Sequence, residues 1–229
     1  MYRKVVTDVF FDLDHTLWDF EKNSELTFKK IFEEHDIPVS LPEFLAAYVP
    51  INFAFWKLFR EEKISKENLR YQRLKQTFDK IGFKATDAQI NTLSEGYIAH
   101  LSSFNYTFPG AHAILEYLRP NYKLHIITNG FANVQEKKLR NANILDYFSV
   151  VVNSEMAGVK KPNPKIFNLA LEMAKVPANK SIMIGDSLEA DILGAKALGL
   201  HALHFNAHNE PKHNVCDIIY DLNEIKNFL

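Results

Sequence analysis

The hydrophobic pattern divides the chain into two regions with different periodicities. Residues 5–13 are apolar except for Thr7, Asp8 and Asp12, which predicts a buried strand ending in carboxylates. The next block of the chain has apolar residues at helical spacing among charges, and it contains no convincing strand. It predicts four helices, over 21–35, 42–60, 66–81 and 86–101, the last beginning with Thr86 as an N-cap.

After Pro109 and Gly110 the pattern becomes a regular alternation of strands and helices. Strands are predicted at 123–128, 150–153, 181–184 and 201–205, and helices at 111–119, 132–141, 164–175 and 190–198, with short segments at 218–220 and 222–228 closing the chain. Such alternation implies right-handed crossovers and a parallel sheet covered on both faces. The expected fold is α/β, with a Rossmann-like core formed by residues 1–17 and 106–229 and an all-helical domain inserted at 18–105.

Composition narrows the classes of protein that fit. The chain has 229 residues, a net charge of -1 and 47% hydrophobic residues, so it can bury a sizeable core and offers no basic excess for nucleic acid. The single cysteine, Cys216, forms no internal disulfide, and no apolar run approaches the ~20 residues of a membrane helix. We expect a cytoplasmic protein that binds neither nucleic acid nor membrane. The sequence leaves its oligomeric state open.

Candidate chemistry is concentrated in four short segments, three of which follow predicted strands. These are 10–16 (FFDLDHT), 126–130 (IITNG), 158–162 (GVKKP) and 185–187 (GDS), with Asp191 a few residues further on. Parallel sheets bind ligands beyond the carboxyl ends of their strands, so segments distant in sequence are expected to meet there. Thr128 is followed by Asn129, a residue type that tolerates unusual backbone angles, so this turn can present one O–H and successive N–H groups to an anion.

The residue types at these sites indicate a metal ion and a phosphate. Asp12, Asp14 and Asp186 are hard oxygen ligands that suit Mg²⁺. The donors that suit a phosphate are Thr128, Asn129 and Lys161, with Lys160 as a competing candidate for the lysine. Each segment alone has an ordinary alternative: a loop-start acid pair, a turn, a solvated lysine pair, or helix-capping aspartates.

Together, in this order, the four segments resemble the haloacid dehalogenase (HAD) superfamily, and the helical insertion resembles that family's helical cap. The resemblance implies a phosphatase in which Asp12 is the nucleophile and Asp14 the general acid and base. It implies Mg²⁺ held by Asp12, Asp186 and the backbone carbonyl of Asp14, with Asp191 supporting the metal site. Thr128, Asn129 and Lys161 are then the substrate-binding residues, and Lys161 also orients Asp12.

A narrower resemblance, to the pyrimidine 5′-nucleotidases, rests on three segments: 127–131 (ITNGF), 161–167 (KPNPKIF) and 185–194 (GDSLEADILG). It implies a small phosphate monoester as substrate, such as a nucleoside 5′-monophosphate. The alternatives are a sugar-phosphate mutase, a phosphoglycolate-type phosphatase, or a non-catalytic binding module on the same fold. The aromatic residues of the insertion, Phe53, Phe55, Trp56 and Phe59, fit either a helical core or a wall that stacks on a base.

Overall fold

The computed structural model describes residues 2–229, which form two compact units. One consists of residues 2–20 together with Asn105–Leu229, and the other of Glu21–Phe104. We call them the α/β unit and the helical unit. Within the described residues, no helix is both long enough and apolar enough to cross a membrane.

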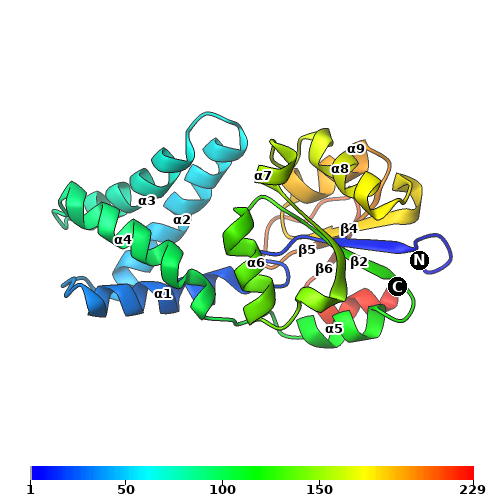
Figure 1. Ribbon diagram of the computed structural model, residues 1–229, viewed down its shortest axis with the longest axis horizontal. Coiled ribbons are helices and arrows are strands. Elements are labelled where there is room, and N and C mark those ends of the chain that lie inside the picture. The colour runs from blue at the N-terminus through cyan, green and yellow to red at the C-terminus, as the bar shows by residue number, and fades with distance from the viewer. Residues whose placement is uncertain (1) are drawn as a thin grey trace. The chain divides into compact units, whose positions relative to one another are not determined.

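The α/β unit is built on a six-stranded sheet in the order β3-β2-β1-β4-β5-β6. All neighbouring strands are parallel, as the alternating pattern predicts (Figure 1). The strands are β1 (Asp8–Phe11), β2 (Lys123–Thr128), β3 (Phe148–Asn153), β4 (Ser181–Gly185), β5 (His201–Phe205) and β6 (Asp217–Ile219). The predicted α/β fold with a parallel sheet and a helical insertion is confirmed, although β1 is shorter than its apolar run.

Helices cover both faces of this sheet (Figure 1). They are α5 (Ala111–Leu118), α6 (Ala132–Asn141), α7 (Ser154–Ala157), α8 (Pro164–Ala174) and α9 (Gly194–Ala197). A buried cluster on one face joins Phe10, Ile127 and Met183 of the sheet to Ile166 and Phe167 of α8. This cluster packs α8 against the central strands β1, β2 and β4.

Two segments differ from the expected pattern. The helix predicted at 190–198 begins earlier, as a π-helical segment over Leu188–Leu193, and continues into α9. The short helix α7 was not predicted, because its single turn is too brief to show a period of 3.6 residues.

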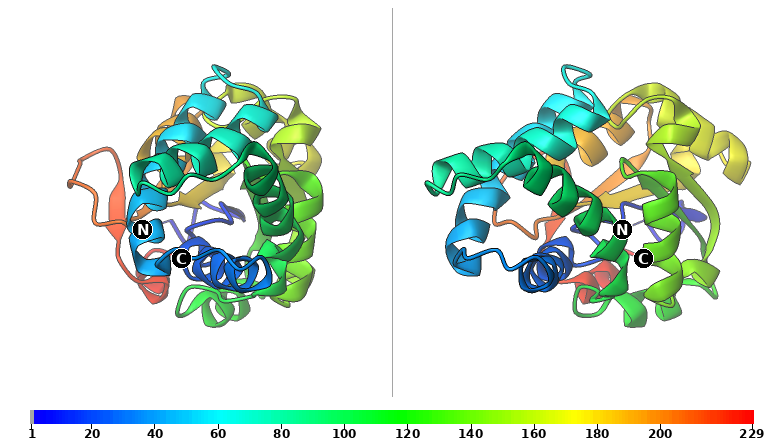
Figure 2. Two further views of the ribbon diagram at one scale, coloured as in Figure 1. Left: turned by 90° about the vertical axis from the view of Figure 1, so that its left-hand side faces the viewer. Right: turned by 60° about the vertical axis from the view of Figure 1, so that its left-hand side comes forward.

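The helical unit contains α1 (Phe20–Glu34), α2 (Leu41–Arg60), α3 (Lys66–Lys80) and α4 (Asp87–His100). Helix α2 packs along α3, and α3 packs on α4 (Figure 2). Thr86 and Gln89 form a capping box at the start of α4, which confirms Thr86 as the N-cap. The interior is aromatic: Phe28 contacts Phe44 and Tyr48 at ring-centroid distances of 4.7 and 4.6 Å. Phe55 and Phe59 are buried, whereas Phe53 is exposed.

Candidate active site

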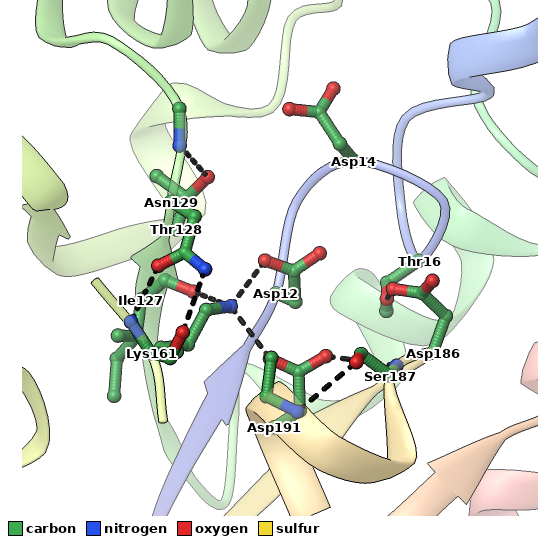
Figure 3. Close-up of polar contacts among 12 residues, drawn as sticks. Asp12, Asp14, Thr16, Ile127, Thr128, Asn129, Lys161, Asp186, Ser187 and Asp191 are labelled. Carbon is green, nitrogen blue, oxygen red and sulfur yellow. Dashed lines mark hydrogen bonds and ion pairs between the residues drawn. The ribbon is translucent and has the colours of Figure 1, made fainter. Parts of the chain in front are cut away.

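The central strands end together, and a polar side chain follows each of them. At Phe11, β1 is in register with both β2 and β4. Thr128 is the last residue of β2, and Asp12 and Asp186 directly follow β1 and β4, so all three lie one or two residues beyond that level. From β1 the chain adds β2 and β3 on one side of the sheet, and then adds β4, β5 and β6 on the other side of β1. These residues (Figure 3) therefore lie at a topological switch point, where the direction of strand addition reverses.

Lys161 is the cation at the centre of the site (Figure 3). Its side chain is buried, and its Nζ lies 2.5 Å from Asp12 Oδ1 and 2.7 Å from Asp191 Oδ1. The same nitrogen donates to the backbone carbonyl of Ile127 at 2.6 Å. An ammonium group has three hydrogens, and three acceptors surround this one. The lysine therefore has a fixed position and joins two carboxylates that would otherwise repel each other.

Asn129 holds the backbone of Lys161. Its Oδ1 accepts a hydrogen bond from the Lys161 N–H at 2.7 Å, and its Nδ2 donates to the Lys161 carbonyl at 3.1 Å. The side-chain amide of Asn129 thus uses its oxygen and one N–H on Lys161, and the donors that Asn129 can offer to a phosphate are its second amide N–H and its backbone N–H. Lys160, the competing lysine, has a half-buried position instead.

The turn after β2 has ordinary backbone angles. Neither Asn129 nor Gly130 has a positive φ, so the unusual angles that Asn129 tolerates are not used here. Gly130 is needed for space instead: a Cβ at this position would lie 2.4 Å from Cδ of Gln135. Thr128 Oγ1 accepts from Gln135 Nε2 at 2.6 Å and from the Gly130 N–H at 3.2 Å. The Thr128 hydroxyl hydrogen therefore points elsewhere and can be donated to an anion.

Asp186 is held from both sides. Thr16 Oγ1 donates to its Oδ1 at 3.3 Å, and His208 Nε2 lies 3.5 Å from its Oδ2. Its backbone carbonyl accepts from His204 Nε2 at 2.7 Å. Although burial opposes ionisation, His208, His15 and Lys161 lower the pKa of Asp186. Asp186 is therefore ionised at neutral pH.

Asp191 lies in the π-helical segment and faces back toward the end of β4. Its Oδ2 accepts from the Ser187 N–H at 3.1 Å. Ser187, rather than an aspartate, is the N-cap of this segment, since its Oγ accepts from the Ala190 N–H at 3.1 Å. Gly185 makes room for Asp191, because a Cβ there would lie 2.3 Å from Asp191 Oδ2.

The carboxylates of Asp12, Asp186 and Asp191 form a cluster that fits a divalent cation. One oxygen from each lies within 4.8 Å of the others. Burial raises the pKa of Asp12, and Asp191 and Asp186 add to the rise while Lys161 opposes it. Burial likewise raises the pKa of Asp191. Lys161 bridges Asp12 and Asp191. Three hard oxygen donors crowded in this way match the ligand preferences of Mg²⁺.

The Asp14 carboxylate is oriented away from this cluster, toward α6 (Figure 3). Its Oδ1 lies 2.5 Å from Lys138 Nζ, and its Oδ2 accepts from Gln135 Nε2 at 2.8 Å. If Asp14 serves as a metal ligand, its backbone carbonyl is the atom that remains for the role.

Sequence reasoning missed Gln135 and Lys138, and it gave Thr16 no role. The signal for Thr16 was its place in the segment 10–16, four residues after Asp12. For Gln135 and Lys138 the available signal was their separation of three residues on one predicted helix, which places both on the same face.

Comparison with known proteins identifies the family. A sequence model of the haloacid dehalogenase-like hydrolases matches residues 9–199. The chain is 33% identical over 202 residues to the pyrimidine 5′-nucleotidase YjjG of Escherichia coli (strain K12), covering 88% of this chain and 86% of that protein. It is 36% identical over 206 residues to the glyceraldehyde 3-phosphate phosphatase of Pyrococcus abyssi, covering 86% and 80%.

Among solved structures, the putative HAD-hydrolase YfnB from Bacillus subtilis, bound to magnesium, has a TM-score of 0.87 at 28% identity and covers 98% of both chains. The chain therefore belongs to the haloacid dehalogenase-like hydrolases, and it is an enzyme. The predicted family and the predicted likeness to pyrimidine 5′-nucleotidases are both confirmed.

Proposed function

We propose that this hydrolase is a Mg²⁺-dependent phosphomonoesterase that forms an aspartyl-phosphate on Asp12 and acts on pyrimidine nucleoside 5′-monophosphates. The observation that carries the proposal is the contact of Lys161 with Asp12 and Asp191 beside the three-carboxylate cluster. A carboxylate is an accepted nucleophile toward phosphoryl groups, provided that cations offset the repulsion between the two anions. The α/β unit then serves as the catalytic core, and the helical unit as a cap.

The first step is attack on phosphorus by Asp12. Lys161 occupies Oδ1 of Asp12, which leaves Oδ2 as the attacking atom. The new Oδ2–P bond forms as the bond from phosphorus to the ester oxygen breaks, and the leaving oxygen keeps the electron pair and takes a proton from Asp14. Thr128 donates its hydroxyl hydrogen to a phosphoryl oxygen, and Lys161 offsets the charge that develops there.

The second step returns the enzyme to its starting form. A water molecule attacks the phosphorus of the aspartyl-phosphate and gives a proton to Asp14, and the Oδ2–P bond breaks to release inorganic phosphate. Asp12, Asp186 and the Asp14 carbonyl would hold Mg²⁺, with Asp191 in support. When bound, the ion supplies charge neutralisation between the acids and the phosphoryl oxygens.

The substrate class rests on similarity. YjjG, which this chain resembles over most of its length, is a pyrimidine 5′-nucleotidase. The comparable similarity to a glyceraldehyde 3-phosphate phosphatase supports a second candidate, a sugar-phosphate phosphatase with the same mechanism.

Phosphate release in the presence of Mg²⁺ tests both candidates. The panel contains dUMP, dTMP, purine nucleoside monophosphates, glyceraldehyde 3-phosphate, hexose phosphates and phosphoglycolate, each assayed with the native protein and with Asp12→Asn. We expect the highest kcat/KM for dUMP or dTMP, and no turnover by Asp12→Asn at unchanged thermal stability. A preference for a sugar phosphate would replace the nucleotidase assignment, and turnover by Asp12→Asn would refute the aspartyl-phosphate mechanism.

A further inference from the structure

The inward face of α6 carries two polar side chains that the mechanism above does not use. Gln135 and Lys138 are both buried, at 1% and 2% exposure, and lie three residues apart on this helix. Residues at this spacing face the same side of a helix. Both side chains contact Asp14, the proposed general acid and base.

Lys138 is positioned by one carboxylate and two aromatic rings. Its Nζ lies 2.5 Å from Asp14 Oδ1, 4.1 Å from the ring centroid of Trp18 and 5.3 Å from that of Phe20. Burying an ammonium group is costly unless an anion or the face of an aromatic ring compensates for the lost hydration. These contacts leave the lysine little freedom, and they fix the Asp14 carboxylate against it.

Gln135 joins Asp14 to the proposed phosphoryl-binding residue. Its Nε2 donates to Asp14 Oδ2 at 2.8 Å and to Thr128 Oγ1 at 2.6 Å. Both contacts use Nε2, so Gln135 presents the donor end of its amide to the accepting oxygens of Asp14 and Thr128. The Gln135 Oε1 is buried and has no hydrogen-bond partner among the described residues. An orphaned amide oxygen destabilises the fold, which indicates that the orientation of this side chain serves the site.

From this geometry we propose that Lys138 and Gln135 are positioning residues that hold the Asp14 carboxyl group at a fixed place relative to the phosphoryl site at Thr128. The inference rests on the proposed phosphatase function. A phosphoryl oxygen that accepts the Thr128 hydroxyl hydrogen leaves the Thr128 oxygen bonded to Gln135. The Gln135 amide therefore contacts both Thr128, which binds the phosphoryl group, and Asp14, whose carboxyl group must reach the leaving oxygen. It sets the position of one relative to the other.

The dependence of kcat/KM on the leaving group tests the inference. Protonation of the leaving oxygen by Asp14 matters for a nucleoside 5′-monophosphate, whose leaving group is a strongly basic alkoxide. It matters little for p-nitrophenyl phosphate, whose leaving group is a weakly basic phenolate. For Lys138→Met we expect kcat/KM to fall at least about tenfold with the nucleotide, and less than about threefold with p-nitrophenyl phosphate. Lys138→Arg keeps the cation and should recover part of the loss. Lys137→Met, at an exposed position of the same helix, is the matched control and should change neither value.

A double-mutant cycle with Asp14→Asn shows whether Lys138 acts through Asp14. Adding Lys138→Met to Asp14→Asn should cost no further activity, because the group that the lysine positions is already disabled. If Lys138→Met does not fold, as judged by circular dichroism and thermal unfolding, Gln135→Met takes its place in the same comparison.

Equal losses on both substrates, or additive losses in the cycle, would overturn the positioning role while leaving the phosphatase proposal intact. Absence of turnover by the native protein on every phosphate ester would refute the proposed function itself, and the positioning role with it.

Discussion

The ammonium group of Lys161 lies 2.5 Å from Asp12 Oδ1, although 149 positions of sequence separate the two residues. Burial alone would lower the pKa of Lys161, but Asp12 and Asp191 raise it above its ordinary value. The lysine is therefore charged at neutral pH. The fold thus provides a positive charge next to the proposed nucleophile.

Replacing this charge should impair catalysis strongly. For Lys161→Met we expect kcat/KM to fall by about 10²–10³-fold, the range typical of removing a donor that stabilises transition-state charge. Lys160→Met is the matched control, because it removes a lysine from the adjacent position without touching Asp12. Steady-state kinetics on the preferred substrate measures both. If Lys160→Met proved the more damaging change, the assignment of the lysine would be reversed.

Mg²⁺ should stabilise the folded protein as well as activate it. Three carboxylates within 4.8 Å repel each other, and a bound cation relieves that repulsion in the folded state only. At free Mg²⁺ near 100 times its Kd, the free energy of unfolding should rise by about 2.7 kcal/mol. Urea unfolding with Mg²⁺, and with EDTA at matched ionic strength, measures this gain in the free energy of unfolding. Asp186→Asn should reduce the gain sharply. Full activity in EDTA would contradict the metal requirement.

Gly185 should be intolerant of even one added methyl group. In Gly185→Ala the new Cβ would lie 2.3 Å from Asp191 Oδ2, so the carboxylate must move away from both Lys161 and the metal cluster. We expect a loss of about 1–3 kcal/mol in the free energy of unfolding, together with weaker Mg²⁺ binding measured by calorimetry.

Gly96→Ala is the control for the Gly185 substitution. Its Cβ would meet Ile31 Cγ2 at 3.4 Å, an ordinary contact, and alanine favours the helix by about 1 kcal/mol. Unchanged Mg²⁺ affinity in Gly185→Ala would show that Asp191 does not support the metal.

The stability of the sheet should depend on pH through His125. This residue is buried, its Nε2 lies 2.8 Å from Asp8 Oδ1, and burial lowers its pKa below 6.5 while Asp8 partly opposes the shift. The folded state therefore binds this proton more weakly than the unfolded state. The contribution of His125 to stability is complete above pH 6.5 and is lost as the pH falls through the pKa of the folded state.

Urea unfolding of the native protein and of His125→Gln, from about pH 8 to about pH 5.5, isolates this effect. Both proteins retain the carboxyl cluster, so its contribution cancels in the difference between them. The native protein should lose stability more steeply as the pH falls. At about pH 8, His125→Gln should be the less stable of the two, because Asp8 loses its contact with His125 and retains the hydrogen bond from Thr7. Parallel pH profiles would show that His125 does not titrate between the two states.

The sequence by itself determined the fold class and most of the proposed chemical groups. Asp12, Thr128 and Asp186 could be found because each follows a short apolar, β-branched run that predicts a buried strand, and parallel strands end at one edge. Thr86 could be identified as an N-cap because capping is a local interaction among neighbouring residues. These signals need no knowledge of distant contacts.

Only the tertiary structure decided how these groups are held. Lys138 stands in the run Glu136-Lys137-Lys138, which by composition indicates a solvated helix face, yet packing turns it inward onto Asp14 and Trp18. Gly130 and Gly185 are required because Gln135 and Asp191 approach them, and no local pattern records such an approach. Local periodicity shows which face of an element is apolar, whereas the partner of a buried charge depends on where another segment of chain is placed.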